Sequence, residues 1–285
     1  FQIILLLIGR IPLFDTLCIS FGTAGTGGFG IVNDSMGSYS TYCQVVTTIF
    51  MILFGVNFSA YYLLLTKKFV QAFKFEEVRY YFGIILAAIL VIGLNTAHLF
   101  RNLGEAFQQA AFQVGSIITT TGFSSTDFSQ WPSLSKTILV LLMFVGACAG
   151  STGGGMKVSR IILLLKVAKN EMSYLIHPRR VRQIRLNGQP VNKETVRSVQ
   201  SYLLVYICIG VLSVLLVALD EFDFGTTFSS VVTALNNVGP GIGLVGPSGN
   251  FSIFSPLSKI VLILDMLAGR LEIFPFMMLL SLIKR

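Results

Sequence analysis

The chain has 285 residues, of which 53% are hydrophobic and only 12% are charged, and its mean hydropathy is +0.76. These values lie far from those of soluble globular domains. Residues 39–66, 81–100 and 199–219 hold almost no charge, and about 20 such residues are enough to cross a bilayer. The composition therefore excludes a soluble protein and predicts an integral membrane protein.

The first repeating unit is expected at residues 1–68. Its apolar pattern predicts a leading helix at 1–11, whose earlier part we expect to lie upstream, a half-helix near 13–24 and an outgoing helix near 39–66. A glycine loop, TGGFG, occupies residues 26–30. The pattern G-x-G-x-x-G is present, but positions 45–56 are uncharged and a turn follows the loop, so a dinucleotide site is excluded.

The second unit, residues 69–170, is expected to contain a leading helix near 78–100, a half-helix at 104–118 and an outgoing segment from 134 to about 169. A second glycine loop, TTGFS, lies at residues 120–124. The outgoing helix is expected to break at 149–156, because each glycine costs a helix about 1 kcal/mol. The break resembles a phosphate loop, but Met156 separates its glycines from Lys157, so that reading fails.

A basic connection is expected at 171–194, followed by the third unit at 195–285. This unit is predicted to contain a leading helix at 195–219, a half-helix at 224–236, the loop NVGPG and an outgoing helix at about 255–283. Arg270 falls near the middle of the last helix, and a charge at that depth indicates a functional role. We expect it to project into a pore below the loops, near residues 150–155, where it repels cations or tethers that segment.

The charges give the orientation. Basic residues gather between the units and acidic residues lie in the other connections, so the basic side is cytoplasmic and all three glycine loops enter from outside. Because membrane spans flank the basic run at 157–197, they account for its charge without nucleic acid. The cysteines stand singly and the two histidines lie far apart, so neither disulfides nor zinc ligands are expected.

Irregular backbone inside a membrane must be buried in protein or line a water-filled path, so three similar loops predict the wall of a pore. A cation can exchange its hydration shell for rings of backbone carbonyls. Glycine adopts the required backbone angles at little steric cost, so Gly28, Gly122 and Gly239 are the expected pivots. Phe29 and Phe123 are expected to pack outward as supports. The candidate filter residues are Thr26, Gly27, Gly28, Thr120, Thr121, Gly122, Asn237, Val238 and Gly239.

Simpler explanations compete with this interpretation. A single glycine loop is more often an ordinary turn, and only the threefold recurrence favours a filter. The segment at 150–155 is either a mobile plug beneath the filter or a static helix kink. In the first case the gate consists of Gly150, Ser151, Thr152, Gly153, Gly154, Gly155 and Arg270.

At these residues the sequence resembles the TrkH/KtrB family of potassium-translocating subunits, and its details are nearer TrkH. The motifs are TTTGF at 119–123, CAGSTGGGMK at 148–157, LNNVGPG at 235–241 and GRLE at 269–272. The resemblance implies an all-α membrane fold, with tandem helix–pore-loop–helix repeats around a pseudo-fourfold ion pore. Three of the four repeats are visible, and the missing one corresponds to the family's first. It also implies filter roles for the three pivot glycines.

Through the same resemblance we expect potassium uptake across the inner membrane, with K⁺ held by the carbonyls of Gly27, Gly28, Thr121, Gly122, Val238 and Gly239. A homodimer surrounded by lipid is implied, with a cytoplasmic TrkA/KtrA-like ring of regulatory subunits. That ring, rather than this chain, would bind the nucleotide, so no cofactor is expected here.

Three alternatives stay open. The protein could transport sodium or a mixture of sodium and potassium, since the missing repeat contributes to selectivity, or this truncated copy could be inert. A membrane enzyme is disfavoured, because Asp265, Arg270 and Glu272 form no recognisable acid–base group.

Overall fold

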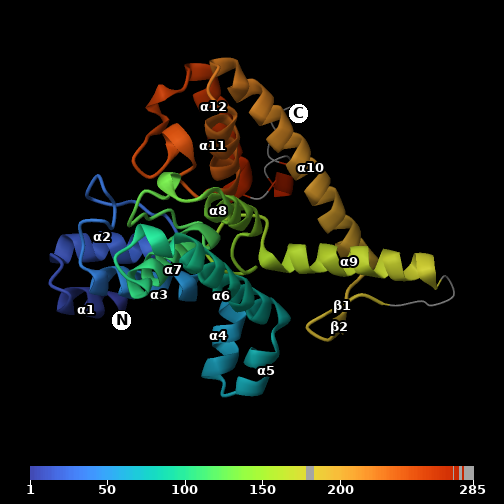
Figure 1. Ribbon diagram of the computed structural model, residues 1–285. Coiled ribbons are helices and arrows are strands. Elements are labelled where there is room, and N and C mark those ends of the chain that lie inside the picture. Colours follow the sequence, from blue (N-terminus) through green and yellow to red (C-terminus); the bar gives the residue numbers. More distant parts are fainter. Residues whose placement is uncertain (178–182, 272, 276–277, 279–285) are drawn as a thin grey trace.

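The structure is a computed structural model that describes residues 1–177, 183–271, 273–275 and 278. Its described part is dominated by helices, which fall into three successive helix–loop–helix units (Figure 1). The predicted all-α fold with tandem units is therefore confirmed.

The first unit contains a bend within the helix that was predicted at 39–66. Its helices are α1 (Gln2–Ile8), α2 (Leu13–Ala24), α3 (Thr41–Phe54) and α4 (Phe58–Leu65). The expectation of one continuous helix over 39–66 was wrong, because α3 and α4 meet at 91°. Asn57 accounts for the new start, since its side chain accepts a hydrogen bond from the Ser59 amide (2.8 Å) and caps α4.

The second unit surrounds a buried half-helix. Its elements are α5 (Phe69–Lys74), α6 (Glu76–Thr96), α7 (Leu103–Ile118), α8 (Ser133–Val145) and α9 (Val158–Ile176). The half-helix α7 begins at Asn102, whose side chain accepts from the Glu105 amide (2.8 Å). It packs against α3, α6 and α8, so every residue from Phe112 to Ile118 is buried, while its first turns are only partly covered.

The third unit follows a short antiparallel hairpin, β1 (Arg185–Leu186) and β2 (Gln189–Pro190), below the projecting end of α9 (Figure 1). Its helices are α10 (Lys193–Val217), α11 (Phe224–Asn236) and α12 (Pro256–Arg270). The last predicted helix falls partly outside the described residues, at 272, 276–277 and 279–285. Residues 178–182 of the basic connection also lie outside them. Short 3₁₀ turns occur at Ala97–Leu99, Phe128–Gln130, Ala218–Asp220, Gly243–Val245 and Phe251–Ile253.

Two helical stretches, Glu76–Leu99 and Lys193–Asp220, are long and apolar enough to cross a membrane, and the bent pair α3–α4 makes a third if it counts as one span. Their outer faces remain uncovered, with Leu86, Leu90 and Leu94 exposed along α6. Large apolar side chains at such spacing face lipid in a membrane helix, whereas water would disfavour them.

Separate apolar clusters fill the units. Leu6, Ile19 and Met51 of the first unit form one cluster with Phe123 of the second. The largest cluster joins α6, α7 and α8, and a third forms between α10, α11 and α12. Because each half-helix packs against neighbouring helices, the position of its C-terminal end is fixed.

Candidate functional site: three glycine loops and a glycine-rich segment beneath them

The loops after α2, α7 and α11 have the same backbone conformation. Thr26, Thr120 and Asn237 are left-handed, with φ of 51°, 56° and 55°. Two residues later, Gly28, Gly122 and Gly239 have φ of 63°, 86° and 112°. Side chains with a Cβ resist such angles, which explains why glycine recurs at the second position.

The hydrogen bonds of the loops repeat as well. The amides of Gly27, Thr121 and Val238 donate back to the carbonyls of Gly22, Ser116 and Thr233, at 2.7, 2.9 and 2.9 Å. These bonds satisfy carbonyls at the ends of the half-helices. Among the described residues, no hydrogen bond ends on the carbonyl oxygens of Thr121, Gly122 or Val238. Those oxygens are therefore free to interact with a ligand.

The second loop lies against both the first and the third. A Cβ on Gly28 would come within 3.0 Å of the Thr121 carbonyl, and a Cβ on Gly122 would come within 3.0 Å of the Val238 carbonyl. The structure thus brings the three predicted pivots together in the order of the chain. Gly239 differs, because the nearest atom to its Cβ position is the Gly122 Cα at 3.7 Å.

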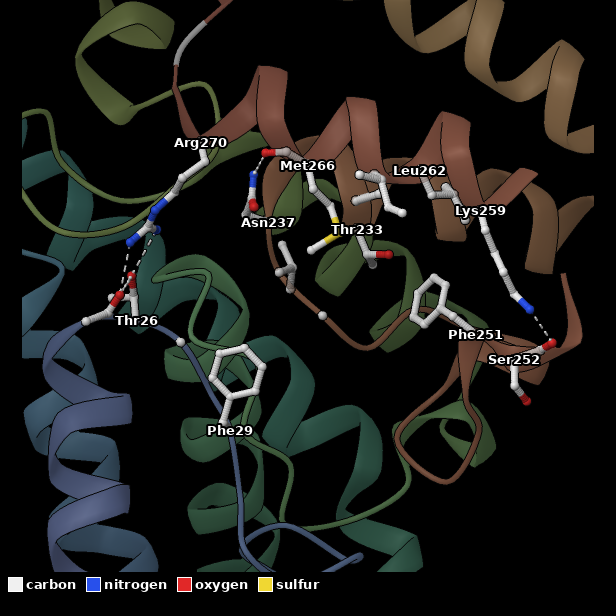
Figure 2. A pocket seen from close by; sticks show the side chains of 16 residues that line it. Thr26, Phe29, Thr233, Asn237, Phe251, Ser252, Lys259, Leu262, Met266 and Arg270 are labelled. Atoms are coloured by element: carbon white, nitrogen blue, oxygen red, sulfur yellow. Dashed lines mark hydrogen bonds between the residues drawn. The ribbon is translucent and has the colours of Figure 1, made fainter. Parts of the chain in front are cut away.

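A cavity of about 820 Å³ opens on the side between the third loop and the first (Figure 2). Thr26, Phe29, Val238, Gly239 and Arg270 are among the residues that line it. The ring of loops is consequently closed on two sides and open on this one. Phe29 was expected to pack as a support, but it is 81% exposed and faces this cavity, whereas Phe123 is fully buried.

Residues 146–157, which we call the glycine-rich loop, connect α8 to α9. The break is wider than the expected 149–156, because Gly146 (φ 68°) ends α8 and Lys157 (φ 77°) precedes α9. Helix geometry is lost at both positions, since a left-handed residue cannot continue a right-handed helix.

This loop touches the end of every half-helix that the structure describes. The Thr26 hydroxyl donates to the Thr152 carbonyl (3.0 Å), and the Gly154 amide donates to the Thr120 hydroxyl (2.6 Å). A Cβ on Gly154 would lie 2.6 Å from the Asn236 carbonyl. The loop therefore lies directly against the inner ends of α2, α7 and α11, and only glycine fits there.

One expected role of Arg270 required hydrogen bonds to the carbonyls of residues 150–155, but its partners lie at the end of α2 and the start of the first loop instead. Its Nη2 donates to the Gly25 carbonyl (3.1 Å), and Nη1 lies 3.5 Å from the Thr26 hydroxyl (Figure 2). The Gly25 carbonyl terminates α2, and a cation is favourable at a helix C-terminus. Among the described residues, Thr26, which binds Thr152, links Arg270 to the glycine-rich loop. Glu272, two residues on, lies outside the described residues.

The comparisons with known proteins agree with this geometry. The family model "TrkH: Cation transport protein" matches residues 4–284. The chain belongs to the TrkH family. Trk system potassium uptake protein TrkH of Vibrio parahaemolyticus is 36% identical over 281 residues, which is 96% of this chain and 57% of that relative. The Salmonella typhimurium TrkH is 34% identical over 274 residues, covering 94% of this chain and 56% of the relative.

A solved structure shows the same fold. The crystal structure of the potassium transporter TrkH from Vibrio parahaemolyticus matches with a TM-score of 0.90 and 34% identity, over 98% of this chain and 60% of that one. The chain spans little more than half the length of the curated relatives it matches. These matches support the conclusion that the chain is a multi-pass membrane protein of a cation-transport family rather than of an enzyme family.

Two residues that matter to the TrkH-family loop were missed in the sequence. Glu77, in the first turn of α6, is 3% exposed and accepts hydrogen bonds from the Ala149 and Ser159 amides. Asn57, at the bend, donates to the same carboxylate (3.2 Å). The two amides that bind Glu77 lie more than 70 residues away from it in the sequence, so no local pattern marks its role. The pair Gly55–Asn57 was the available signal for the bend.

The acid–base alternative gains no support from the geometry. Asp265 is buried and accepts from the Ser213 hydroxyl (2.7 Å), away from Arg270's partners. Within the described residues, His, Cys, Asp and Glu side chains form no group of three or more that could hold a metal ion. The polar groups that the neighbouring loops bring close to one another are neutral backbone carbonyls.

Proposed function

We propose that the protein mediates potassium uptake, as the channel-like translocating subunit of a Trk-type system in the inner membrane. The observation that carries the proposal is the contact between the loops, which places hydrogen-bond-free carbonyls of Thr121, Gly122 and Val238 next to one another. Neutral oxygens replace the hydration shell of K⁺ without holding it by fixed charge. The relatives named as potassium uptake proteins support the choice of ion.

Within this proposal the filter is formed by the loop residues. K⁺ contacts the backbone carbonyls of Gly27, Gly28, Thr121, Gly122, Val238 and Gly239. Gly28 and Gly122 each face a neighbouring carbonyl, but Gly239 faces the cavity. A fourth loop of the same kind, in protein outside residues 1–285, would complete the ring on that side.

The glycine-rich loop and Arg270 act as the gate. The loop lies against the inner ends of all three half-helices, so an ion that passed between them would meet Thr152, Gly153 and Gly154. Opening requires the loop to leave these positions. The charge of Arg270 repels cations beside the glycine-rich loop, and its hydrogen bond to the Gly25 carbonyl holds the end of α2.

The partners follow from the family. We propose a homodimer surrounded by lipid, with a cytoplasmic TrkA/KtrA-like ring that binds the regulatory nucleotide. The chain itself then carries no cofactor, performs no chemical conversion and binds no nucleic acid. The relatives' name, a Trk uptake system, supports the presence of other components.

Ion flux into liposomes that contain the purified full-length protein tests this function. We expect K⁺ and Rb⁺ to enter at similar rates and Na⁺ to enter at least about tenfold more slowly, because a rigid carbonyl cage favours the larger ions. Na⁺ entry at the same rate as K⁺ would favour the sodium or mixed transporter instead. Absence of flux for every cation, with the protein correctly inserted, would contradict the proposal.

A further inference from the structure

The carboxylate of Glu77 is buried, and both its oxygens accept hydrogen bonds where residues 147–149 and 158–159, which we call the neck of the glycine-rich loop, lie together. Its Oε1 accepts from the Ala149 amide (2.6 Å) and from the Ser159 amide (3.1 Å). Its Oε2 accepts from the Asn57 side-chain amide (3.2 Å). Only 3% of the residue is exposed. A carboxylate withdrawn from water requires such hydrogen bonds, and bonds of this charged kind are stronger than neutral ones.

The two backbone donors lie on opposite sides of the loop. Ala149 precedes the glycine-rich residues, and Ser159 follows them in the first turn of α9. Next to them, the Val158 amide donates to the Ala147 carbonyl (3.1 Å), so the two limbs meet here. Glu77 supplies an acceptor for an unpaired amide at the start of α9, as a capping residue does, but from another helix.

The bend between α3 and α4 contacts the same limb of the loop. The Gly55 carbonyl accepts from the Cys148 amide (3.0 Å), and the Phe58 amide donates to the Gly150 carbonyl (3.1 Å). Asn57, between these two positions, reaches Glu77. The neck is thus held by α6 on one side and by the α3–α4 bend on the other.

We infer that Glu77 is a positioning residue for the gate, which keeps the neck of the glycine-rich loop closed by holding Ala149 and Ser159 together. The inference rests on the proposed function, because it assigns the loop a closed and an open position. Residues 150–155 cannot leave the half-helices far while both limbs are fixed at one carboxylate. Release of the Ala149 amide is the step that opening requires.

Glu77→Gln and Asn57→Ser are the variants that test this role. The glutamine keeps one acceptor oxygen but loses the charge and one acceptor. The serine preserves a good cap for α4 and removes only the reach to Oε2. Glu76→Gln is the matched control, since Glu76 is the adjacent carboxylate but pairs with Lys166 (2.6 Å) rather than with the loop.

Two measurements on the full chain separate the gate from the fold. The first is the rate at which a membrane-impermeant thiol reagent, added from the cytoplasmic side, modifies Cys148, with Cys18, Cys43 and Cys208 replaced by alanine. Cys148 is fully buried beside the neck, so its reactivity reports opening. The second is K⁺ flux into liposomes without regulatory partners.

We expect Glu77→Gln and Asn57→Ser to increase both the labelling rate and the flux, by about tenfold for Glu77→Gln, because hydrogen bonds to a charged group are lost. Glu76→Gln should leave both unchanged. Labelling and flux equal to wild type in both neck variants would overturn the inference. So would faster labelling with flux abolished, since Glu77 would then support the fold. Absence of K⁺ flux in the wild type would refute the proposed function alone, because labelling does not depend on the ion.

Discussion

The backbone of Gly122 lies against the carbonyl oxygen of Val238, so closely that a Cβ atom on Gly122 would come within 3.0 Å of that oxygen. The two residues are 116 positions apart and occupy the second and third loops. Gly28 has the same relationship to the Thr121 carbonyl. The loops are therefore packed by their main chains, and the spacing between neighbouring carbonyls depends on the absence of side chains.

Gly122→Ala should consequently reduce K⁺ flux by about tenfold or more, since the methyl group forces the loops apart and a left-handed backbone disfavours alanine. Ion flux in liposomes measures the effect, with thermal unfolding of the purified protein as a check on folding. Gly83→Ala is the control, because Gly83 lies in helix α6 and a Cβ atom there would meet nothing within 4 Å. Equal flux in the two variants would show that the second loop does not line the ion path.

Thr120→Val tests the contact between the second loop and the glycine-rich loop. The substitution keeps the shape and the β-branch but removes the oxygen that accepts from the buried Gly154 amide (2.6 Å). An unpaired buried amide costs about 1–3 kcal/mol, so the closed position should be weakened.

We expect a higher basal K⁺ flux, by about tenfold, without a change in the ratio of K⁺ to Na⁺ flux. Thr137→Val is the control, because the Thr137 hydroxyl is exposed and bonds only within α8. If flux in Thr120→Val stayed at the wild-type level, the Gly154 bond would have no part in closure.

Much of this site could be predicted because its signals are local. A left-handed glycine after an amphipathic half-helix has a strong sequence preference, so the three loops were placed correctly in the chain. The half-helices expected at 104–118 and 224–236 agree with α7 (Leu103–Ile118) and α11 (Phe224–Asn236). The run of glycines at 150–155 likewise excludes a continuous helix wherever it occurs.

The rest depends on contacts between distant segments. The α3–α4 bend lies in a stretch without charged residues, and its freed backbone groups are satisfied by Cys148 and Gly150, about 90 residues away. The carboxylate of Glu77 is stable only because the Ala149 and Ser159 amides reach it. Phe29 is exposed because it lies at the open side of the ring of loops. An apolar aromatic residue by itself gives no sign of that position.

Asp223 gives a prediction about acid stability. It precedes α11, and the hydroxyl (2.5 Å) and amide (3.0 Å) of Thr226 hold the pKa of its carboxyl below the ordinary value. A lowered pKa in the folded state means that this stabilisation is present above pH of about 4 and is lost as the pH falls through the folded pKa.

Asp223→Asn should therefore show a smaller loss of thermal stability than wild type between about pH 5 and pH 3, while retaining a good helix cap at neutral pH. Because Asp223 is largely exposed, solvent screening keeps the difference small, at most about 1 kcal/mol. Thermal unfolding in detergent at several pH values measures it. Parallel pH profiles of the two proteins would show that Asp223 has no share in the acid sensitivity.

Arg270 allows its charge to be separated from its hydrogen bonds. Its guanidinium donates to the Gly25 carbonyl (3.1 Å) and contacts Thr26, which holds Thr152 in the glycine-rich loop. Arg270→Gln keeps a donor but removes the charge, whereas Arg270→Lys keeps the charge but loses the planar pair of donors. If the charge is the barrier, only Arg270→Gln should raise K⁺ flux. If the tether to α2 matters, both should raise it.

We expect both variants to raise basal K⁺ flux, Arg270→Gln by about tenfold and Arg270→Lys by less, because a hydrogen bond to a charged group is lost in each but the barrier survives in the lysine variant. Lys259→Gln is the matched control, since Lys259 lines the same cavity from the other end of α12 and bonds to the Ser252 carbonyl (2.9 Å). If K⁺ flux depended only on the total positive charge of the cavity, Lys259→Gln and Arg270→Gln would change it equally. Flux at the wild-type level in Arg270→Gln would remove Arg270 from the gate.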